Sequence, residues 1–236
     1  MYQVDWWSDI EPDLLLNVIR KDTTKRELRL FACACARRIW SKFAEVAALC
    51  AAVEVAEAYV DEEASTFDLA NVQSAAEESI IGIDIVETFD ARSAAYACAD
   101  AEITMGNLRT IAWLAAFSHS HPDDYDDQRS KETEEERIAQ RHLLRDIFLD
   151  PSMTLPSKSV GDALGDETVR RLAQDLYENR TLPAGTFDPS KILELRLRLK
   201  DLGYSDPTVM NHLESPHPHV RGCWVVDLIL GKRSLS

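Results

Sequence analysis

The chain has 236 residues, 45% of them hydrophobic, and a formal net charge of −15. This length allows one large domain or two small ones with a buried core, and the hydrophobic content excludes wholesale disorder. The charge argues against a nucleic-acid-binding protein, because no surplus of Lys and Arg is present to neutralise phosphates. It argues equally against docking on an anionic membrane, and leaves a basic protein partner or simple solubility.

The sequence also bears on the cellular compartment. It contains no apolar run of about 18 residues, the length that predicts a transmembrane helix, and residues 1–7 lack the basic and apolar regions of a signal peptide. The 5 cysteines are odd in number and scattered among helical patterns, which is not typical of a disulfide framework. We therefore expect a cytoplasmic protein whose thiols are free and mostly buried.

The composition favours helices, because Gly (8) and Pro (9) are scarce while Ala, Leu, Glu and Arg recur. Pro12 is well placed to open a short helix. Two capping boxes follow, in which Thr24 and Glu27, and then Ser65 and Asp68, can satisfy each other's free N–H groups. After each box, apolar residues recur at steps of three and four, so each box predicts the start of a helix.

Two further helical patterns and a break complete the N-terminal half. Helices are predicted over 43–60 and over 91–117, an Ala-rich segment. Residues 119–128 then break the helical pattern with Ser, Pro and Asp. We interpret them as an acidic loop between an N-terminal helical lobe, 1–118, and a C-terminal helical lobe, 129–236. The two lobes are expected to pack as one unit.

The C-terminal lobe begins with a polar helix predicted over 131–148. Asp166, Asp188 and Asp206 are placed to cap three further helices, the last two with a proline at the first helical position. The tail, 219–231, predicts a final helix, although its Trp-Val-Val sequence leaves a strand as the alternative. The predicted fold class is all-α, a multi-helix bundle with one or two packed lobes.

The strongest candidate site lies near the tail, where His212, His217, His219 and Cys223 offer metal ligands within a short stretch. Zinc takes about four nitrogen or sulfur donors in a tetrahedron, so this set could form a zinc site. The spacing matches no named zinc motif, and two prolines stiffen the stretch. On sequence alone a structural interpretation is favoured, with His219 bonded to the last helix, Cys223 in the core and His217 exposed.

A second candidate cluster consists of His119, His121, Asp123 and Asp124. Imidazoles and carboxylates together could hold zinc, manganese or non-haem iron. Because this segment is predicted to be an acidic loop, a solvated turn is the favoured interpretation.

Other polar residues are interpreted as structural. Cys33 and Cys35 stand two residues apart on a helix, about 200° around its axis, so they cannot join in one site. Both are expected to be packing residues. Arg221 and Asp227 would not share a helix face, and each is expected to pair with another helix, Arg221 with the acidic side of 145–146.

Five segments together form a recognisable pattern. They are 28–35, 37–40, 52–57, 143–148 and the tail motif His219-Val220-Arg221-Gly222-Cys223-Trp224-Val225-Val226-Asp227. In this order they resemble a family of bacterial proteins, abundant as multi-copy paralogues in planctomycete genomes, for which no activity is established. The resemblance covers nearly the whole chain and implies a bacterial origin but no catalytic residues. Where family members pair cysteines, this chain carries Ala36 and Leu213, which weakens a metal or redox interpretation built on those pairs.

The sequence contains no Gly-x-Ser-x-Gly, no phosphate-binding glycine loop and no His-Glu-x-x-His. Together with the charge and the helical composition, this favours a non-enzymatic helical module that binds another protein, as a regulator or adaptor. The alternative is a metal-dependent, hydrolase-like enzyme that uses zinc at His212, His217, His219 and Cys223.

Overall fold

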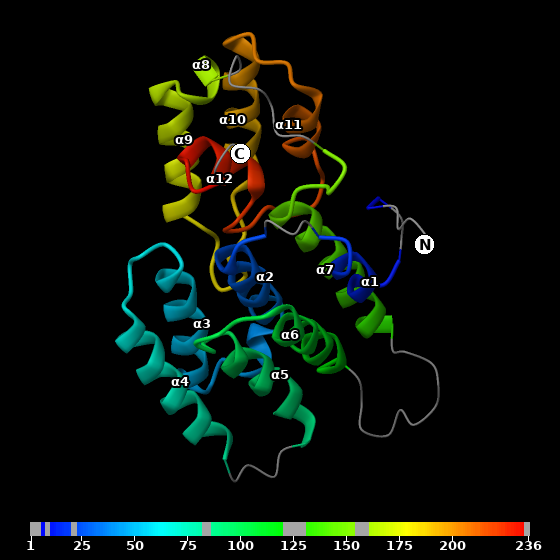
Figure 1. Ribbon diagram of the computed structural model, residues 1–236, viewed down its shortest axis with the longest axis vertical. Coiled ribbons are helices and arrows are strands. Elements are labelled where there is room, and N and C mark those ends of the chain that lie inside the picture. Colours follow the sequence, from blue (N-terminus) through cyan, green and yellow to red (C-terminus); the bar gives the residue numbers. More distant parts are fainter. Residues whose placement is uncertain are drawn as a thin grey trace. The chain divides into compact units, whose positions relative to one another are not determined.

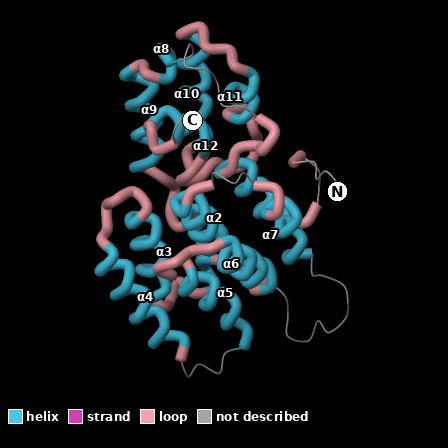
Figure 2. The backbone as a smooth tube through the Cα atoms, in the orientation of Figure 1, coloured by secondary structure: helices cyan, strands magenta, loops and turns pink. Residues whose placement is uncertain are grey.

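The computed structural model describes residues 6–7, 10–19, 23–81, 86–119, 131–153 and 161–233. Every regular element in this part of the chain is a helix, so the predicted all-α class is confirmed (Figures 1 and 2). The chain forms two compact units, Met1–Leu144 and Arg145–Ser236. The predicted boundary at 119–128 lies almost entirely outside the described residues, and the division between the two units falls further along the chain, after Leu144.

The helices of the N-terminal unit follow one another with short connections. In chain order they are α1 (Pro12–Leu16), α2 (Lys25–Arg38), the short 3-10 helix η1 (Trp40–Lys42), α3 (Ala47–Tyr59), α4 (Thr66–Ile80), α5 (Val86–Ala97), α6 (Met105–Phe117) and α7 (Lys131–Ile147). Helix α7 belongs to this unit as far as Leu144, and its remaining residues belong to the C-terminal unit.

Three of these helices begin with a capping box. Thr24 and Glu27 at α2, and Ser65 and Asp68 at α4, form the predicted reciprocal hydrogen bonds. A third box, in which Thr104 is bonded to Asn107, opens α6. This box was not predicted, and it corrects the expected helix over 91–117, which is divided into α5 and α6. Asn at the fourth position of this box accepts the backbone N–H of the N-cap residue, as Glu and Asp do in the other two boxes.

A second correction concerns the helix predicted over 43–60. Helix α3 begins only at Ala47, because the chain first passes through η1 and a turn. Phe43 is fully buried in this turn, and its ring centroid lies 5.3 Å from that of Trp40. Phe43 therefore belongs to the core without being helical.

Helix α2 is the buried centre of the N-terminal unit. It packs against α3, α5 and α6, and every residue from Glu27 to Arg37 is buried. Such a helix needs small side chains for close approach and partners for its charges. Ala and Cys are the small side chains of α2. Among its charges, the Arg29 guanidinium finds a partner by donating to the carbonyl oxygen of Cys98 at 2.7 Å.

The buried charge of Arg37 is matched by Glu57 of α3. The two side chains form a bidentate pair, with Nε–Oε1 and Nη2–Oε2 distances of 2.7 Å each. Only 3% and 4% of the two side chains remain exposed. The guanidinium also lies 5.1 Å from the centroid of the Trp40 ring. Because neither charge reaches water, each depends on the other.

The C-terminal unit contains α8 (Gly161–Leu164), α9 (Glu167–Glu178), α10 (Pro189–Asp201), α11 (Pro207–His212) and α12 (Trp224–Leu230). Asp166, Asp188 and Asp206 cap α9, α10 and α11 as predicted, each accepting backbone N–H groups of the first turn. The core is formed by their apolar faces, including Leu176, Leu195, Val209, Val225 and Ile229.

The tail is only partly helical. Helix α12 begins at Trp224, so Trp-Val-Val is helical and the alternative of a strand there is wrong. Before it, Val220 forms an isolated bridge with Thr186, and the N–H of Phe187 donates to the His219 carbonyl at 2.8 Å. Gly222 has a φ of 98°, a conformation that favours glycine, so the sharp turn into α12 depends on this residue.

We predict that Glu57→Ala lowers the free energy of unfolding by about 3–5 kcal/mol, because it leaves the Arg37 guanidinium buried without its counter-charge. Urea unfolding followed by circular dichroism measures the change. Glu102→Ala is the matched control, since the Lys25–Glu102 pair is 68% and 75% exposed and should matter little. Equal effects of the two substitutions would contradict the assignment.

Candidate functional site

Four potential metal ligands converge in the C-terminal unit: Asp146, His212, His219 and Cys223. One donor atom of each lies within 4.8 Å of the donor atoms of the other three. Asp146 is on the last turn of α7, and His212 ends α11. His219 lies in the segment before α12, and Cys223 is the N-cap of that helix. Three separate parts of the chain therefore meet at one point.

The closest contacts are made by the carboxylate of Asp146. Its Oδ1 lies 2.5 Å from His219 Nδ1 and 3.1 Å from His212 Nε2. The Cys223 sulfur lies 3.2 Å from His212 Nε2 and 3.6 Å from His219 Nδ1. The two imidazole rings meet edge-on, with centroids 4.9 Å apart. The donor atoms thus face one another and not the solvent.

Neighbouring groups hold two of these side chains in place. The backbone N–H of Val220 donates to Asp146 Oδ2 at 2.9 Å. The indole N–H of Trp224 donates to His212 Nδ1 at 3.0 Å. Since an indole can only donate, His212 Nδ1 accepts, and the neutral ring then carries its proton on Nε2. Both contacts come from the segment that carries His219 and Cys223.

The electrostatics of the cluster follow from burial and from the opposite charges within it. Burial raises the pKa of Asp146, but the charges of and hydrogen bonds from His219 and His212 outweigh it, so the net pKa lies well below its usual range. Burial lowers the pKa of His212 and is partly opposed by Asp146. Burial and the Asp146 charge raise the pKa of the Cys223 thiol. The Asp146 carboxylate is therefore ionised, and the Cys223 thiol is neutral without an added cation.

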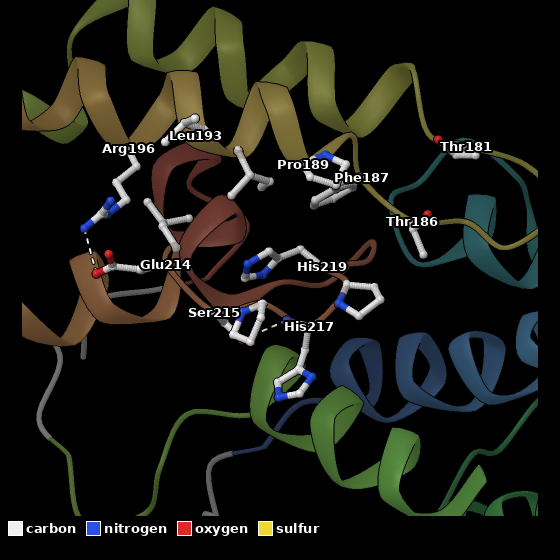
Figure 3. Close-up of a pocket in the computed structure, with 14 residues that line it drawn as sticks. Thr181, Thr186, Phe187, Pro189, Leu193, Arg196, Glu214, Ser215, His217 and His219 are labelled. Atoms are coloured by element: carbon white, nitrogen blue, oxygen red, sulfur yellow. Dashed lines mark hydrogen bonds and ion pairs between the residues drawn. The ribbon is translucent and has the colours of Figure 1, made fainter. Parts of the chain in front are cut away.

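The structure brings together three of the four residues proposed from the tail sequence. His217 is exposed and its ring lies apart from that of His219 (Figure 3). Asp146 takes the fourth place, and sequence reasoning missed it as a ligand. In the sequence, Asp146 was noticed only as the acidic residue of 145–146, which we predicted to pair with Arg221. No spacing rule could pair it with the tail, because 73 residues separate it from His219.

The second candidate cluster and the cysteines of α2 are not part of this site. Of the second cluster, His119 is half-buried at the end of the described segment, while His121, Asp123 and Asp124 lie outside the described residues. Cys33 and Cys35 are fully buried in α2, as expected of packing residues. Burial raises the pKa of the Cys35 thiol, which makes it less nucleophilic.

Arg221 and Asp227 both meet Tyr177 of α9. The phenolic O–H of Tyr177 donates to Asp227 Oδ1 at 2.6 Å. The Arg221 guanidinium lies 5.2 Å from the centroid of the same ring. The prediction that each would pair with another helix is confirmed for Asp227. These contacts connect Arg221 and Asp227 of the tail motif to α9.

Comparison of the chain with protein-family models, with curated proteins and with solved structures gives no match. Among the described helices, none is long and apolar enough to cross a membrane.

We predict that Tyr177→Phe lowers the free energy of unfolding by about 1.5–3 kcal/mol, the usual contribution of a hydrogen bond to a charged group. Tyr204→Phe is the matched control, because this tyrosine is as deeply buried and its hydroxyl has no hydrogen-bond partner among the described residues. Removing that hydroxyl should leave stability unchanged or raise it. Denaturant titrations of both variants measure the difference, and losses of equal size would show that the Asp227 contact is unimportant.

Proposed function

We propose that the protein is a non-enzymatic, zinc-binding helical protein whose C-terminal unit is organised by one ion at Asp146, His212, His219 and Cys223. The observation that carries the proposal is the convergence of a carboxylate oxygen, two imidazole nitrogens and a sulfur within 4.8 Å of one another. In a tetrahedral zinc site, ligand atoms lie within about 4 Å of one another, because each is about 2.0–2.3 Å from the ion.

The donor set favours zinc among the common metals. Calcium and magnesium prefer oxygen ligands, whereas imidazole and thiolate together suit zinc. The ion would supply the positive charge that allows Cys223 to bind as a thiolate, and it would neutralise Asp146 as well. A buried carboxylate and a buried thiolate without such a charge would be strongly unfavourable.

Four protein ligands fill a tetrahedral zinc ion and leave no position for water or substrate. All four side chains are buried or nearly so. These features support a structural ion over the hydrolase-like alternative, which needs an open coordination position. A structural role also suits the elements concerned. Helices α11 and α12 have 6 and 7 residues, far below the roughly 12–15 that an isolated helix needs in water.

Trp224 sets a condition on the role of His212. Because its indole donates to Nδ1, the Nε2 proton of His212 must leave, or the indole contact must break, before Nε2 can bind a metal. Two other ligands also change protonation: Cys223 must lose its thiol proton, and the proton of His219 must leave Nδ1, where it is bonded to Asp146, before these atoms can bind the ion. Metal analysis of His212→Ala separates two roles: loss of the ion makes His212 a ligand, and retention makes it a neighbour that donates a hydrogen bond.

We further propose that the partner of this helical protein is another protein in the bacterial cytoplasm, in keeping with the resemblance noted in the sequence. A hollow of about 360 Å³ lies between α9 and α10, with Leu172, Leu193 and Leu197 among its lining residues. Leu193 and Leu197 are 49% and 48% exposed. Apolar side chains in a shallow hollow are typical of protein contacts, and the net charge of −15 disfavours nucleic acid.

We predict one zinc ion per chain in protein purified without chelator, measured by inductively coupled plasma mass spectrometry. His219→Ala and Cys223→Ser should lose the ion. Chelation of the wild-type ion should lower the unfolding midpoint, because a ligand at about a thousand times its Kd stabilises by about 4 kcal/mol.

His217→Ala and Cys50→Ser are the matched controls for this experiment. His217 is the tail histidine outside the cluster, and Cys50 is a thiol of the N-terminal unit. Both variants should retain the ion. Wild-type protein that contains no transition metal after purification and after incubation with zinc would refute the proposal.

A further inference from the structure

Helix α10 carries two apolar stripes. Ile192, Leu195 and Leu199 are buried in the core of the C-terminal unit. Leu193 and Leu197 lie on another face of the helix, where their spacing of four residues makes them neighbours, and they remain 49% and 48% exposed. A helix on the surface of a compact unit needs only one apolar stripe, which faces the core. The second stripe is therefore available for a partner.

The second stripe lines the hollow between α9 and α10, which lie side by side in the C-terminal unit (Figure 1). The lining runs along α10 from Ser190 to Asp201 and along α9 through Thr168 and Leu172. At 1.5 Å per residue, the lined stretch of α10 is about 16 Å long, or three helical turns. The hollow therefore has the length of a short helix.

The openness of the hollow also suits a helix better than a small molecule. Small-molecule sites bury about 70–90% of the ligand surface. Here Leu193 and Leu197 of the lining are themselves half exposed, so the hollow is open to solvent. An open, apolar groove between two helices is the kind of surface on which an amphipathic helix lays its own apolar face.

The charges in the lining favour a basic partner. Glu194 and Asp201 both line the hollow and are exposed. They stand seven residues apart, which is two helical turns, so they lie on the same side of α10. The one cation of the lining, Arg198, has its Nη2 atom 3.4 Å from Oδ1 of Asp166, the N-cap of α9. The charge that the hollow offers to a partner is therefore negative.

The other cations of α10 are directed elsewhere. Lys191 Nζ lies 2.5 Å from Asp175 Oδ2 of α9. Arg196 turns to the other side of the helix, where its Nη2 lies 2.7 Å from Glu214 Oε2 (Figure 3). Lys200 lies outside the lining of the hollow. These cations therefore leave the two carboxylates of the hollow for a partner.

We infer that the hollow between α9 and α10 is a docking site for a basic amphipathic helix of another protein. The apolar side chains of that helix pack on the leucines of the hollow, and its lysines or arginines, two turns apart, pair with Glu194 and Asp201. The inference rests on the proposed protein partner and specifies its chemistry. A second copy of this chain is a poorer match, because two such faces would bring four carboxylates together.

The test uses the full-length, zinc-loaded protein and a fluorescent peptide of leucine, lysine and alanine, about 18 residues long. Its leucines recur at steps of three and four, with lysines beside them. Fluorescence anisotropy at physiological ionic strength should show binding. A peptide of the same composition in scrambled order should bind about tenfold more weakly or worse, because it has no apolar face. A peptide with glutamate in place of lysine should also bind more weakly.

The decisive variant combines Leu193→Gln with Leu197→Gln, and it should lose about tenfold or more in affinity for the lysine peptide. Leu14→Gln is the matched control, because Leu14 is 46% exposed on α1 of the N-terminal unit. It should bind the peptide as the wild type does. Because all three leucines are exposed, both variants should keep the circular dichroism spectrum and the zinc content of the wild type.

A second variant tests the charges. Glu194→Gln combined with Asp201→Asn should weaken binding about threefold or more and make it less sensitive to salt. Glu167→Gln combined with Glu178→Gln removes the same charge from exposed positions of α9 outside the hollow. This control should bind the peptide as the wild type does.

Four results would overturn the docking site. They are no binding by zinc-loaded protein, equal binding of the scrambled peptide, equal binding by the double leucine variant, and sedimentation of the wild type as a dimer that this variant dissociates. Tighter binding of the glutamate peptide overturns the basic partner and leaves a protein partner standing. Zinc content is measured on each sample, so protein that binds the peptide but never holds zinc overturns the zinc site alone.

Discussion

The C-terminal unit depends on how the charge of one buried carboxylate is compensated. Asp146 lies on the last turn of α7, where the helix dipole is negative and an acidic side chain is unfavourable. Its burial adds a large desolvation cost. The backbone N–H of Val220 and the rings of His212 and His219 all point to its two oxygen atoms. Every segment that meets there is held in position by the same negative charge. The N-terminal unit uses the same principle separately, with Glu57 buried against Arg37.

Much of the fold could be predicted from local chemistry. The capping boxes at Thr24 and Ser65 and the three Asp caps are encoded within four residues, and all of them hold in the structure. The two wrong boundaries have different causes. The predicted helix over 91–117 ran through Thr104 because alanines on both sides keep the helical period, and an Asn is a weaker sign of a cap than Glu. The helix predicted from residue 43 failed because burial of Phe43 needs a turn there.

The sequence predicted the tail ligands of the candidate site but not Asp146. His212, His219 and Cys223 are close in sequence, so their proximity was expected. The place of His217 depends on the path of the chain between two prolines, which spacing alone does not determine. Asp146 was beyond reach because its contacts with the tail cross 73 and 74 residues. Its neighbours in sequence also form an ordinary amphipathic helix, so no local pattern marks it. The Nε2 atom of His219 is buried with no hydrogen-bond partner in the described part of the chain, and this too is a property of packing that no sequence motif records.

The separation of Asp146 from its partners has a consequence for synthesis on the ribosome. Helices α9 and α10 are local structures that can form soon after each is made. Asp146, however, meets none of its tail partners until 73 more residues have followed it, which takes roughly 4 to 15 s at common rates of translation. During this interval the end of α7 must stay hydrated. The core of the C-terminal unit also lacks α12, the helix that contributes Val225 and Ile229. The C-terminal unit is thus open to proteases and chaperones for longer than its small size suggests, and it closes in a single late event.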